Sequence, residues 1–296
     1  MESATNITNI SQVIIDTINN LLGTLFSSID NSVYDILDKL TFIDMDILDY
    51  SFLGKLFNQN SANGLLVIAN SLLLAVCVYY CFKLLYAHFT GIQIERPYQF
   101  VFKLLIFGIF INCSLFIVEF FIYFPTLIDA TIRQIGEMIL GQEISFSTLI
   151  NNLNSVITVD ANSINVFSFE GIVKSLTSVS FISLIFSYSL RYVMIKVFIL
   201  LTPFALISLI NTSTSWFFKS WLKVFLSLLF MQIFISLILI IALSLDFASN
   251  EIISKILIIG SLYALIKANY FVQQFVGGIS TDVSQNLRFL RSRNNI

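Results

Sequence analysis

Few residues of this 296-residue chain offer side chains for enzymatic chemistry. The chain has one histidine, His88, and it lacks both a Gly-Lys-Ser/Thr phosphate loop and a His-Glu-x-x-His metal helix. Cys77 and Cys81 share one helical face, but they lie in an apolar run without nearby His or carboxylate partners, which favours packing over metal binding. We therefore expect no catalytic site, cofactor or metal ion, and any energy-consuming role would need a partner ATPase.

The more informative residues are charges inside apolar segments, namely Glu119, Arg191 and Lys196. A charged side chain at the centre of a bilayer costs about 2.5–3.5 kcal/mol on insertion scales, so such residues are often functional. Two interpretations stay open. The side chains either snorkel to the headgroups or line a translocation path or a seam between subunits. Gln232 also lies in an apolar segment, where it can form a hydrogen bond between helices.

Aromatic residues and a proline mark the expected membrane border. Tyr192, Trp216 and Trp221 lie where an aromatic belt is expected, and anchoring is the typical role of such residues. Pro203 has no N–H and is predicted to interrupt its helix. The stretch 202–220 is therefore expected to lie on the inner face of the membrane or to dip into it, shielded by protein or lining an aqueous cavity.

The composition determines the class of protein that must position these residues. Hydrophobic residues make up 57% of the chain and charged residues 11%, whereas soluble domains have about 45–50% and about 25%. Apolar segments long enough to cross a bilayer occupy 64–87, 100–125, 221–245 and 252–272, with a more complex stretch at 171–211. The sequence predicts an all-α polytopic membrane helix bundle with about five transmembrane helices plus a re-entrant or interfacial segment.

The distribution of charge predicts the orientation of these helices. With a third span at about 171–201, five spans place only two acidic residues, Glu95 and Asp282, on the inner side. The basic residues on that side are Lys83, Arg96, Lys103, Arg191, Lys196, Lys219, Lys223, Lys267, Arg288, Arg291 and Arg293. Because basic residues favour cytoplasmic loops, we expect the N-terminus outside and the C-terminus in the cytoplasm.

The chain divides into five predicted regions. They are an extracytoplasmic amphipathic helical region (1–63), a first transmembrane hairpin (64–125), an extracytoplasmic loop with an amphipathic helix (126–170), a transmembrane core (171–272) and a short basic cytoplasmic tail (273–296). The first region carries an apolar stripe at spacings of three and four, from Ile10 through Ile14 and Ile18. Its other face is acidic, which favours packing against protein over lying on a membrane.

The segment from Arg191 to Gln232 is the most distinctive part of the chain. It combines a basic-ended helix, the turn sequence Pro203-Phe204-Ala205-Leu206, the loop Trp216…Lys219-Ser220-Trp221-Leu222-Lys223 and a following span that contains Gln232. In these features it resembles the core of the VirB6/TrbL family, polytopic inner-membrane subunits of type IV secretion and conjugation machines. The likeness in architecture covers about 60–272, and the short C-terminus departs from the long-tailed members.

The resemblance implies a non-catalytic channel or scaffold subunit in the bacterial inner membrane. It would support substrate passage and pilus or stalk assembly for conjugation, DNA uptake or effector delivery. The implied partners are other inner-membrane subunits of the machine, a separate ATPase, pilus or stalk subunits, further copies of the chain, membrane lipid and the DNA or protein in transit. Two alternatives remain open, a small-solute transporter and a membrane enzyme that acts on lipid through Glu119 or His88.

Overall fold

The computed structural model describes Thr17 and the ranges 31–57, 64–93, 95–156, 169–245 and 252–276. The described part folds into helices joined by turns, without a strand. The helices are α2 (Asn31–Thr41), the 3-10 helix η1 (Met45–Leu48), α3 (Tyr50–Phe57), α4 (Leu65–Thr90), α5 (Pro97–Asn112), α6 (Ser114–Leu140), α7 (Phe146–Val156), α8 (Phe169–Ile207), α9 (Ser215–Leu243) and α10 (Ile252–Val276). The predicted stripe residues Ile10, Ile14 and Ile18 and the tail beyond Val276 lie outside the described residues.

Four of these helices are long and apolar enough to cross a membrane: α4, α6, the part Val179–Ile207 of α8, and α9. The apolar helices Pro97–Asn112 and Ile256–Val272 are shorter. The predicted all-α polytopic membrane bundle is confirmed at this level. Large apolar side chains such as Leu74, Phe89 and Phe116 are exposed along the helices, as a lipid-facing surface requires.

Glycine and proline set several helix ends. Gly91 and Gly141 follow the last residues of α4 and α6 with φ of 68°, and their N–H groups donate to the carbonyls of Ala87 and Glu137. A residue without Cβ adopts this left-handed conformation at little cost, which ends both helices. Pro97 begins α5, where its missing N–H costs no intrahelical hydrogen bond.

Two expectations about helix boundaries are wrong. The predicted span 100–125 is two helices, because the chain breaks at Cys113, where the Asn112 side chain donates to the Gly108 carbonyl at 2.8 Å. The predicted border at 125/126 falls inside α6, which passes through Pro125 and includes the expected amphipathic stretch as its second half. Within the predicted loop region 126–170, a further helix, α7, covers Phe146–Val156.

Pro203 also fails to end its helix. Helix α8 continues to Ile207, and the chain reverses only over 208–214. The carbonyl of Phe198, in the turn that precedes the proline, accepts hydrogen bonds from Thr202 Oγ1 at 3.2 Å and Trp221 Nε1 at 3.0 Å. Side chains of Thr202 and Trp221 thus bind the backbone one turn before the proline, and the helix continues beyond it.

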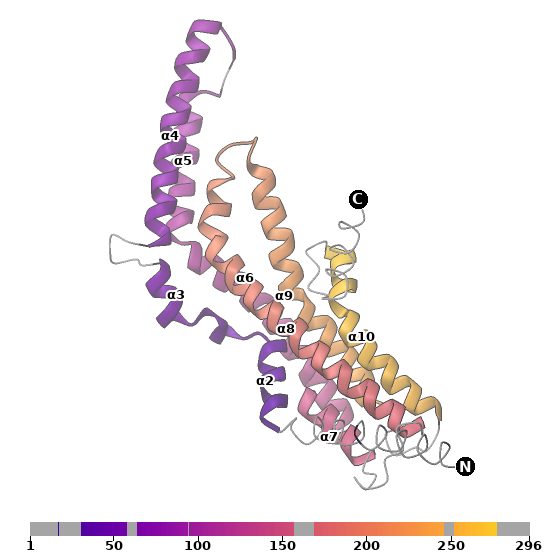
Figure 1. The fold of residues 1–296 in the computed structure, drawn as a ribbon. Helices are drawn as coiled ribbons and strands as arrows, with labels where there is room; N and C mark the ends of the chain where they lie inside the picture. Colours follow the sequence, from indigo (N-terminus) through magenta and orange to yellow (C-terminus); the bar gives the residue numbers. More distant parts are fainter. Residues whose placement is uncertain are drawn as a thin grey trace, which may run out of the picture.

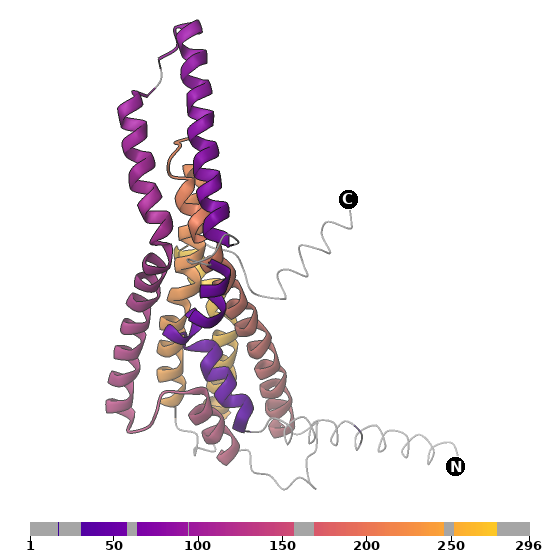
Figure 2. The same ribbon diagram turned by 90° about the vertical axis from the view of Figure 1, so that its left-hand side faces the viewer.

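The helices form two connected parts. Helices α6, α8, α9 and α10 make a bundle in which α9 contacts the other three, and α4 and α5 form an antiparallel hairpin that projects beyond it (Figures 1 and 2). The hairpin contacts α8, while α2 and α7 pack together at the opposite end of the molecule. The α4–α5 and α8–α9 turns lie toward one end, and the α6–α7 connection lies toward the other (Figure 1).

The buried apolar side chains form two clusters that meet near the middle of α8 and α9. One cluster contains Ile195 and later residues of α8 together with α9 up to Leu229. The other contains α8 up to Tyr188 and α9 from Met231 onward. Arg191 lies between the two clusters on α8, and Gln232 lies next to the same boundary on α9, so a polar layer crosses the bundle there.

Candidate functional site

Arg191 is at the centre of this polar layer. Its side chain is fully buried, with 0% of its surface exposed. Its Nε donates to the carbonyl of Leu228 on α9 at 2.8 Å, and its Nη1 donates to the carbonyl of Thr41 at 2.7 Å. Thr41 is the last residue of α2, where a helix leaves carbonyls without intrahelical partners and favours a cation. Arg191 therefore joins α8, α9 and the C-terminal end of α2 rather than snorkelling to a membrane surface.

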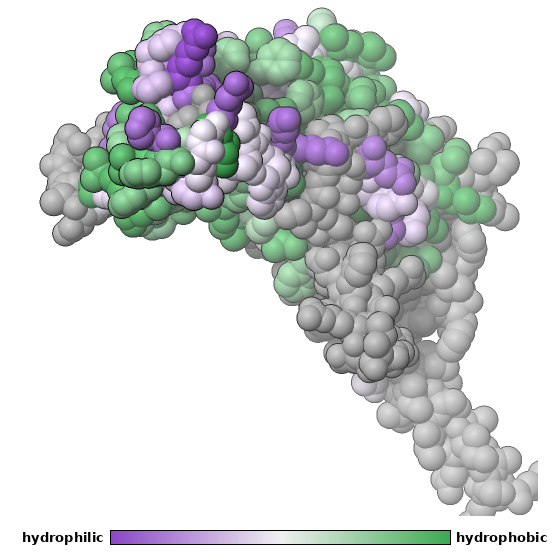
Figure 3. Space-filling model, turned by 90° about the horizontal axis from the view of Figure 1, so that it is seen from above, coloured by the Kyte–Doolittle hydropathy of each residue, from purple (hydrophilic) through white to green (hydrophobic). Residues whose placement is uncertain are grey.

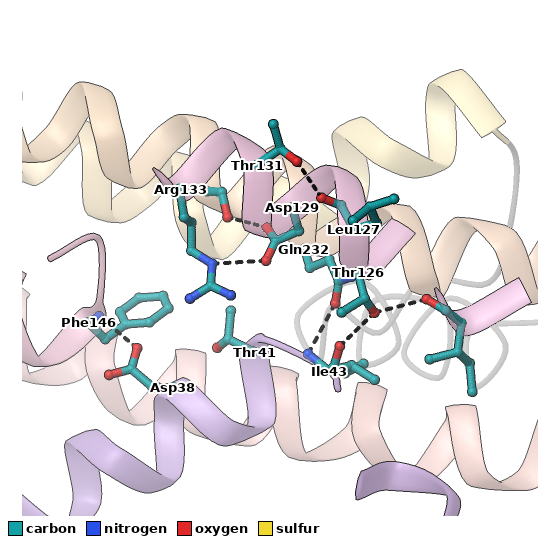
Figure 4. Close-up of polar contacts among 12 residues, drawn as sticks. Asp38, Thr41, Ile43, Thr126, Leu127, Asp129, Thr131, Arg133, Phe146 and Gln232 are labelled. Carbon is teal, nitrogen blue, oxygen red and sulfur yellow. Dashed lines mark hydrogen bonds and ion pairs between the residues drawn. The ribbon is translucent and has the colours of Figure 1, made fainter. Parts of the chain in front are cut away.

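The irregular link between α2 and η1 is held by side chains from two further helices (Figure 4). The Ile43 N–H donates to Gln232 Oε1 on α9 at 3.1 Å, and the Ile43 carbonyl accepts from Thr126 Oγ1 on α6 at 3.1 Å. The Arg133 guanidinium lies 4.3 Å from the centre of the Phe42 ring. Non-helical backbone within a bundle is stable only when such partners satisfy it, so this link is built into the bundle.

Asp129 joins α6 to α9 beside the same link. Its carboxylate is 2% exposed and accepts a short hydrogen bond from Ser236 Oγ, one turn after Gln232. It also accepts from Arg133 Nε at 3.0 Å, one turn further along α6. A carboxylate buried this far from water needs such partners, because an unpaired charge in the interior is costly. Asp129 therefore fixes both the spacing of the two helices and the position of Arg133 over Phe42.

Asp38, in the last turn of α2, joins this helix to α7. Its carboxylate accepts from the Phe146 N–H at 2.7 Å and from Ser147 Oγ at 2.9 Å. These groups belong to the first turn of α7, where free N–H groups favour a negative charge. Burial raises the pKa of Asp38 above 3.8, while the hydrogen bonds from α7 lower it in part. The α2–α7 contact is therefore sensitive to the charge of one carboxyl group.

The structure brings only some of the predicted residues together. Arg191 and Gln232 both hold the link after α2. Trp221 is buried, stacks on Phe225 and donates to the Phe198 carbonyl, so it fixes α8 to α9 and is not an interfacial anchor. Buried Pro203 lies near that contact in the sequence of α8.

Three predicted residues lie outside the layer. Glu119 is half-buried on α6, and no ion pair in the described part of the chain joins it to Arg191 or Lys196. Lys196 lies 5.0 Å from the centre of the Tyr192 ring. Trp216 is 65% exposed at the start of α9, as expected of a surface aromatic.

Sequence reasoning missed Asp38, Thr126, Asp129, Arg133 and Ser236. The sequence does indicate that two pairs share a helix face, since Asp129 and Arg133 are four residues apart, as are Gln232 and Ser236. The contacts of Thr126 with Ile43 and of Asp129 with Ser236, however, join residues more than 80 positions apart, and spacing alone does not identify such contacts. Within the described ranges, no group of three His, Cys, Asp or Glu side chains is arranged to hold a metal ion.

The polar layer thus joins α2, α6, α8 and α9 through hydrogen bonds to backbone groups and between side chains. This is an arrangement that holds helices together. Comparison with known proteins adds no family: no family model, no curated protein and no solved structure matches the sequence.

Proposed function

We propose that this chain is a non-catalytic channel or scaffold subunit of a type IV secretion machine in the bacterial inner membrane, similar to VirB6/TrbL proteins. Its N-terminus would lie outside and its C-terminus in the cytoplasm. It would work with a separate ATPase, other inner-membrane subunits and pilus or stalk subunits to pass DNA or protein. The observation that carries the proposal is that buried Arg191 binds the carbonyls of Leu228 on α9 and Thr41 on α2. Arg191 lies in the segment that resembles this family.

The residues of that segment are used to hold helices in place. Arg191 and Gln232 hold the N-terminal link, and Trp221 holds the α8–α9 hairpin near Pro203. These side chains are directed at backbone groups of the same chain, which suits a scaffold better than a substrate-binding site. The exposed apolar surface of the α4–α5 hairpin is available for contact with lipid and with neighbouring subunits.

The placement of charged residues supports the proposed orientation. Lys83, Arg96 and Lys103 lie on the α4–α5 hairpin near its turn, and Lys219 and Lys223 lie on the first turns of α9. Both turns are at the same end of the molecule (Figure 1). Acidic residues such as Asp38 and Glu143 belong to elements at the opposite end. The positive end is the one expected to face the cytoplasm.

Deletion of the gene in its native host tests the proposal. We expect conjugation, DNA uptake or effector delivery to be lost while growth stays normal, and the full-length chain to restore transfer. Arg191→Met should fail to restore it, whereas Lys196→Met, which also replaces a basic side chain on α8 by methionine, should succeed. Immunoblots of membranes would separate loss of function from loss of protein. Normal transfer in the deletion strain would refute the secretion role.

A further inference from the structure

Two adjoining grooves lie between the α4–α5 hairpin and the α8–α9 turn. Their volumes are about 670 Å³ and about 510 Å³. They share Val76 and Tyr79 on α4 and Asn211 in the α8–α9 turn, so they form one continuous groove. Within the described residues, the polar layer around Arg191 contributes no side chain to it. The groove is therefore a separate feature of the molecule.

The two halves of the groove differ in chemistry. The larger half is lined mainly by apolar residues, among them Leu72, Phe204 and Trp216. The smaller half contains the charged side chains of Lys83, Lys103 and Glu95. Along α4 the apolar half begins at Leu72 and the charged half reaches Lys83, three turns closer to the hairpin turn. The groove thus changes from apolar to charged in one direction.

We propose that this groove binds an anionic phospholipid, with its phosphate near Lys83 and Lys103 and its acyl chains along the apolar half toward Trp216. The α4–α5 turn, next to the charged half, carries the basic residues expected at the inner headgroup level, so a lipid of the inner leaflet would enter in this direction. Seen from this end, hydrophilic and hydrophobic surfaces lie side by side (Figure 3). Such adjoining surfaces suit an amphiphile.

Charge selects an anionic headgroup over a zwitterionic one. Lys103 pairs with Glu95, and the Glu95 carbonyl accepts from Tyr80 Oη at 2.6 Å, which fixes that side of the groove. Lys83 is exposed and makes no ion pair within the described part of the chain. The charged half therefore has one positive charge in excess. A phosphate between the two ammonium groups would balance it.

The proposal can be tested by tryptophan quenching in nanodiscs that contain the full-length protein. The chain has two tryptophans, of which Trp216 lines the groove with 65% exposure and Trp221 is 3% exposed in the core. Phosphatidylglycerol brominated on its acyl chains, diluted into phosphatidylcholine, would be compared with brominated phosphatidylcholine diluted equally into phosphatidylglycerol. We expect the anionic lipid to quench Trp216 at about fivefold lower mole fraction, since a lysine near an anionic surface contributes about 1 kcal/mol.

Matched variants separate the two halves of the groove. Lys83→Gln should abolish the headgroup preference, while Lys55→Gln, the same change at an exposed site on α3, should retain it. Ala75→Trp should fill the apolar half and displace the lipid, whereas Leu74→Trp adds an indole at a 69% exposed position that does not line the groove. Because these tryptophans change the fluorescence, lipid bound to these two variants would be counted by native mass spectrometry.

Two outcomes overturn the proposal. Equal quenching by both headgroups would mean that ordinary surrounding lipid reaches Trp216 without selection. Absence of quenching by either lipid would mean that the groove is closed or is filled by another part of an assembly, such as a polypeptide. Neither result depends on the secretion role, because the test uses purified protein and measures only lipid.

Discussion

At the scale of single residues, buried charges in this protein serve as connections between distant parts of the chain. Arg191 is the clearest case, since its partner Thr41 lies 150 residues away. The Leu228 carbonyl belongs to the interior of α9, whereas the Thr41 carbonyl ends α2. The bond to Thr41 is therefore the one that the fold cannot easily replace, because a carbonyl at a helix end has no intrahelical donor.

Arg191→Met should weaken the fold by leaving that carbonyl buried and unpaired. We expect a loss of about 1–3 kcal/mol in the free energy of unfolding, the usual cost of one unsatisfied buried polar group. Reversible unfolding in mixed micelles measures it, with Lys196→Met as the control on the same helix. An unchanged midpoint for Arg191→Met would show that the link does not depend on this bond.

Asp38 predicts a dependence of the α2–α7 contact on pH. Because its pKa is raised above 3.8 in the folded chain, the folded state holds the proton more tightly than the unfolded state. The contact is therefore most stable below 3.8 and weakens as pH rises through the folded pKa. Asp38→Asn should remove this dependence. Limited proteolysis within α7 at several pH values, corrected for protease activity, measures the effect, and equal dependence in both proteins would contradict it.

At the scale of helices, close packing decides how α6 meets α9. A Cβ placed on Gly136 would lie 2.7 Å from Ile240 Cγ1, closer than Cβ atoms approach neighbouring atoms in folded proteins. Gly136 is buried on α6, in the same helix pair that Asp129 and Ser236 join. Small residues allow two membrane helices to approach in this way. The hydrogen bond and the close packing therefore depend on the same spacing.

Gly136→Ala should separate α6 from α9 and lower the free energy of unfolding by about 1–3 kcal/mol, the usual cost of an overpacked contact. Gly260→Ala on α10 is the matched control, because a Cβ there has nothing within 4 Å. That change should be neutral or stabilise the helix by about 0.5–1 kcal/mol. Thermal unfolding of both variants in detergent measures the difference, and equal midpoints would refute the packing argument.

At the scale of the whole molecule, Lys219 and Lys223 follow one helix connection, and Glu143 lies in another. The α8–α9 turn and the α6–α7 connection lie at opposite ends (Figure 1). Ser213 is exposed in the first and Glu143 in the second. If the bundle crosses the membrane in the proposed direction, the two positions face different compartments.

Ser213→Cys should react with an impermeant thiol reagent only from the cytoplasmic side, and Glu143→Cys only from the outside. Both changes would be made in a chain whose cysteines at 77, 81 and 113 are replaced by serine. Labelling of intact cells compared with inverted membrane vesicles gives the answer. Reaction of both positions from one side would remove the proposed orientation.

The sequence alone predicts properties that depend on the sum of many residues, such as hydrophobicity and charge bias. Transfer of each apolar side chain from water contributes to the same total, so the existence of the long apolar helices and the all-α class could be predicted from composition and length. The bias of the basic residues is also a sum along the chain. It is available from the sequence even though no single lysine or arginine determines it.

Only the tertiary structure decided the local exceptions and the long-range partners. Pro125 and Pro203 lie inside helices, although the sequence rule for proline predicts a break. Trp221 is buried against Phe225 instead of lying at the headgroups. Asp129 accepts a hydrogen bond from Ser236, and Arg191 donates one to the Thr41 carbonyl. The physical reason is that apolar helices present similar surfaces to one another, so their pairing depends on shape and on a few hydrogen bonds whose two partners lie far apart in the chain.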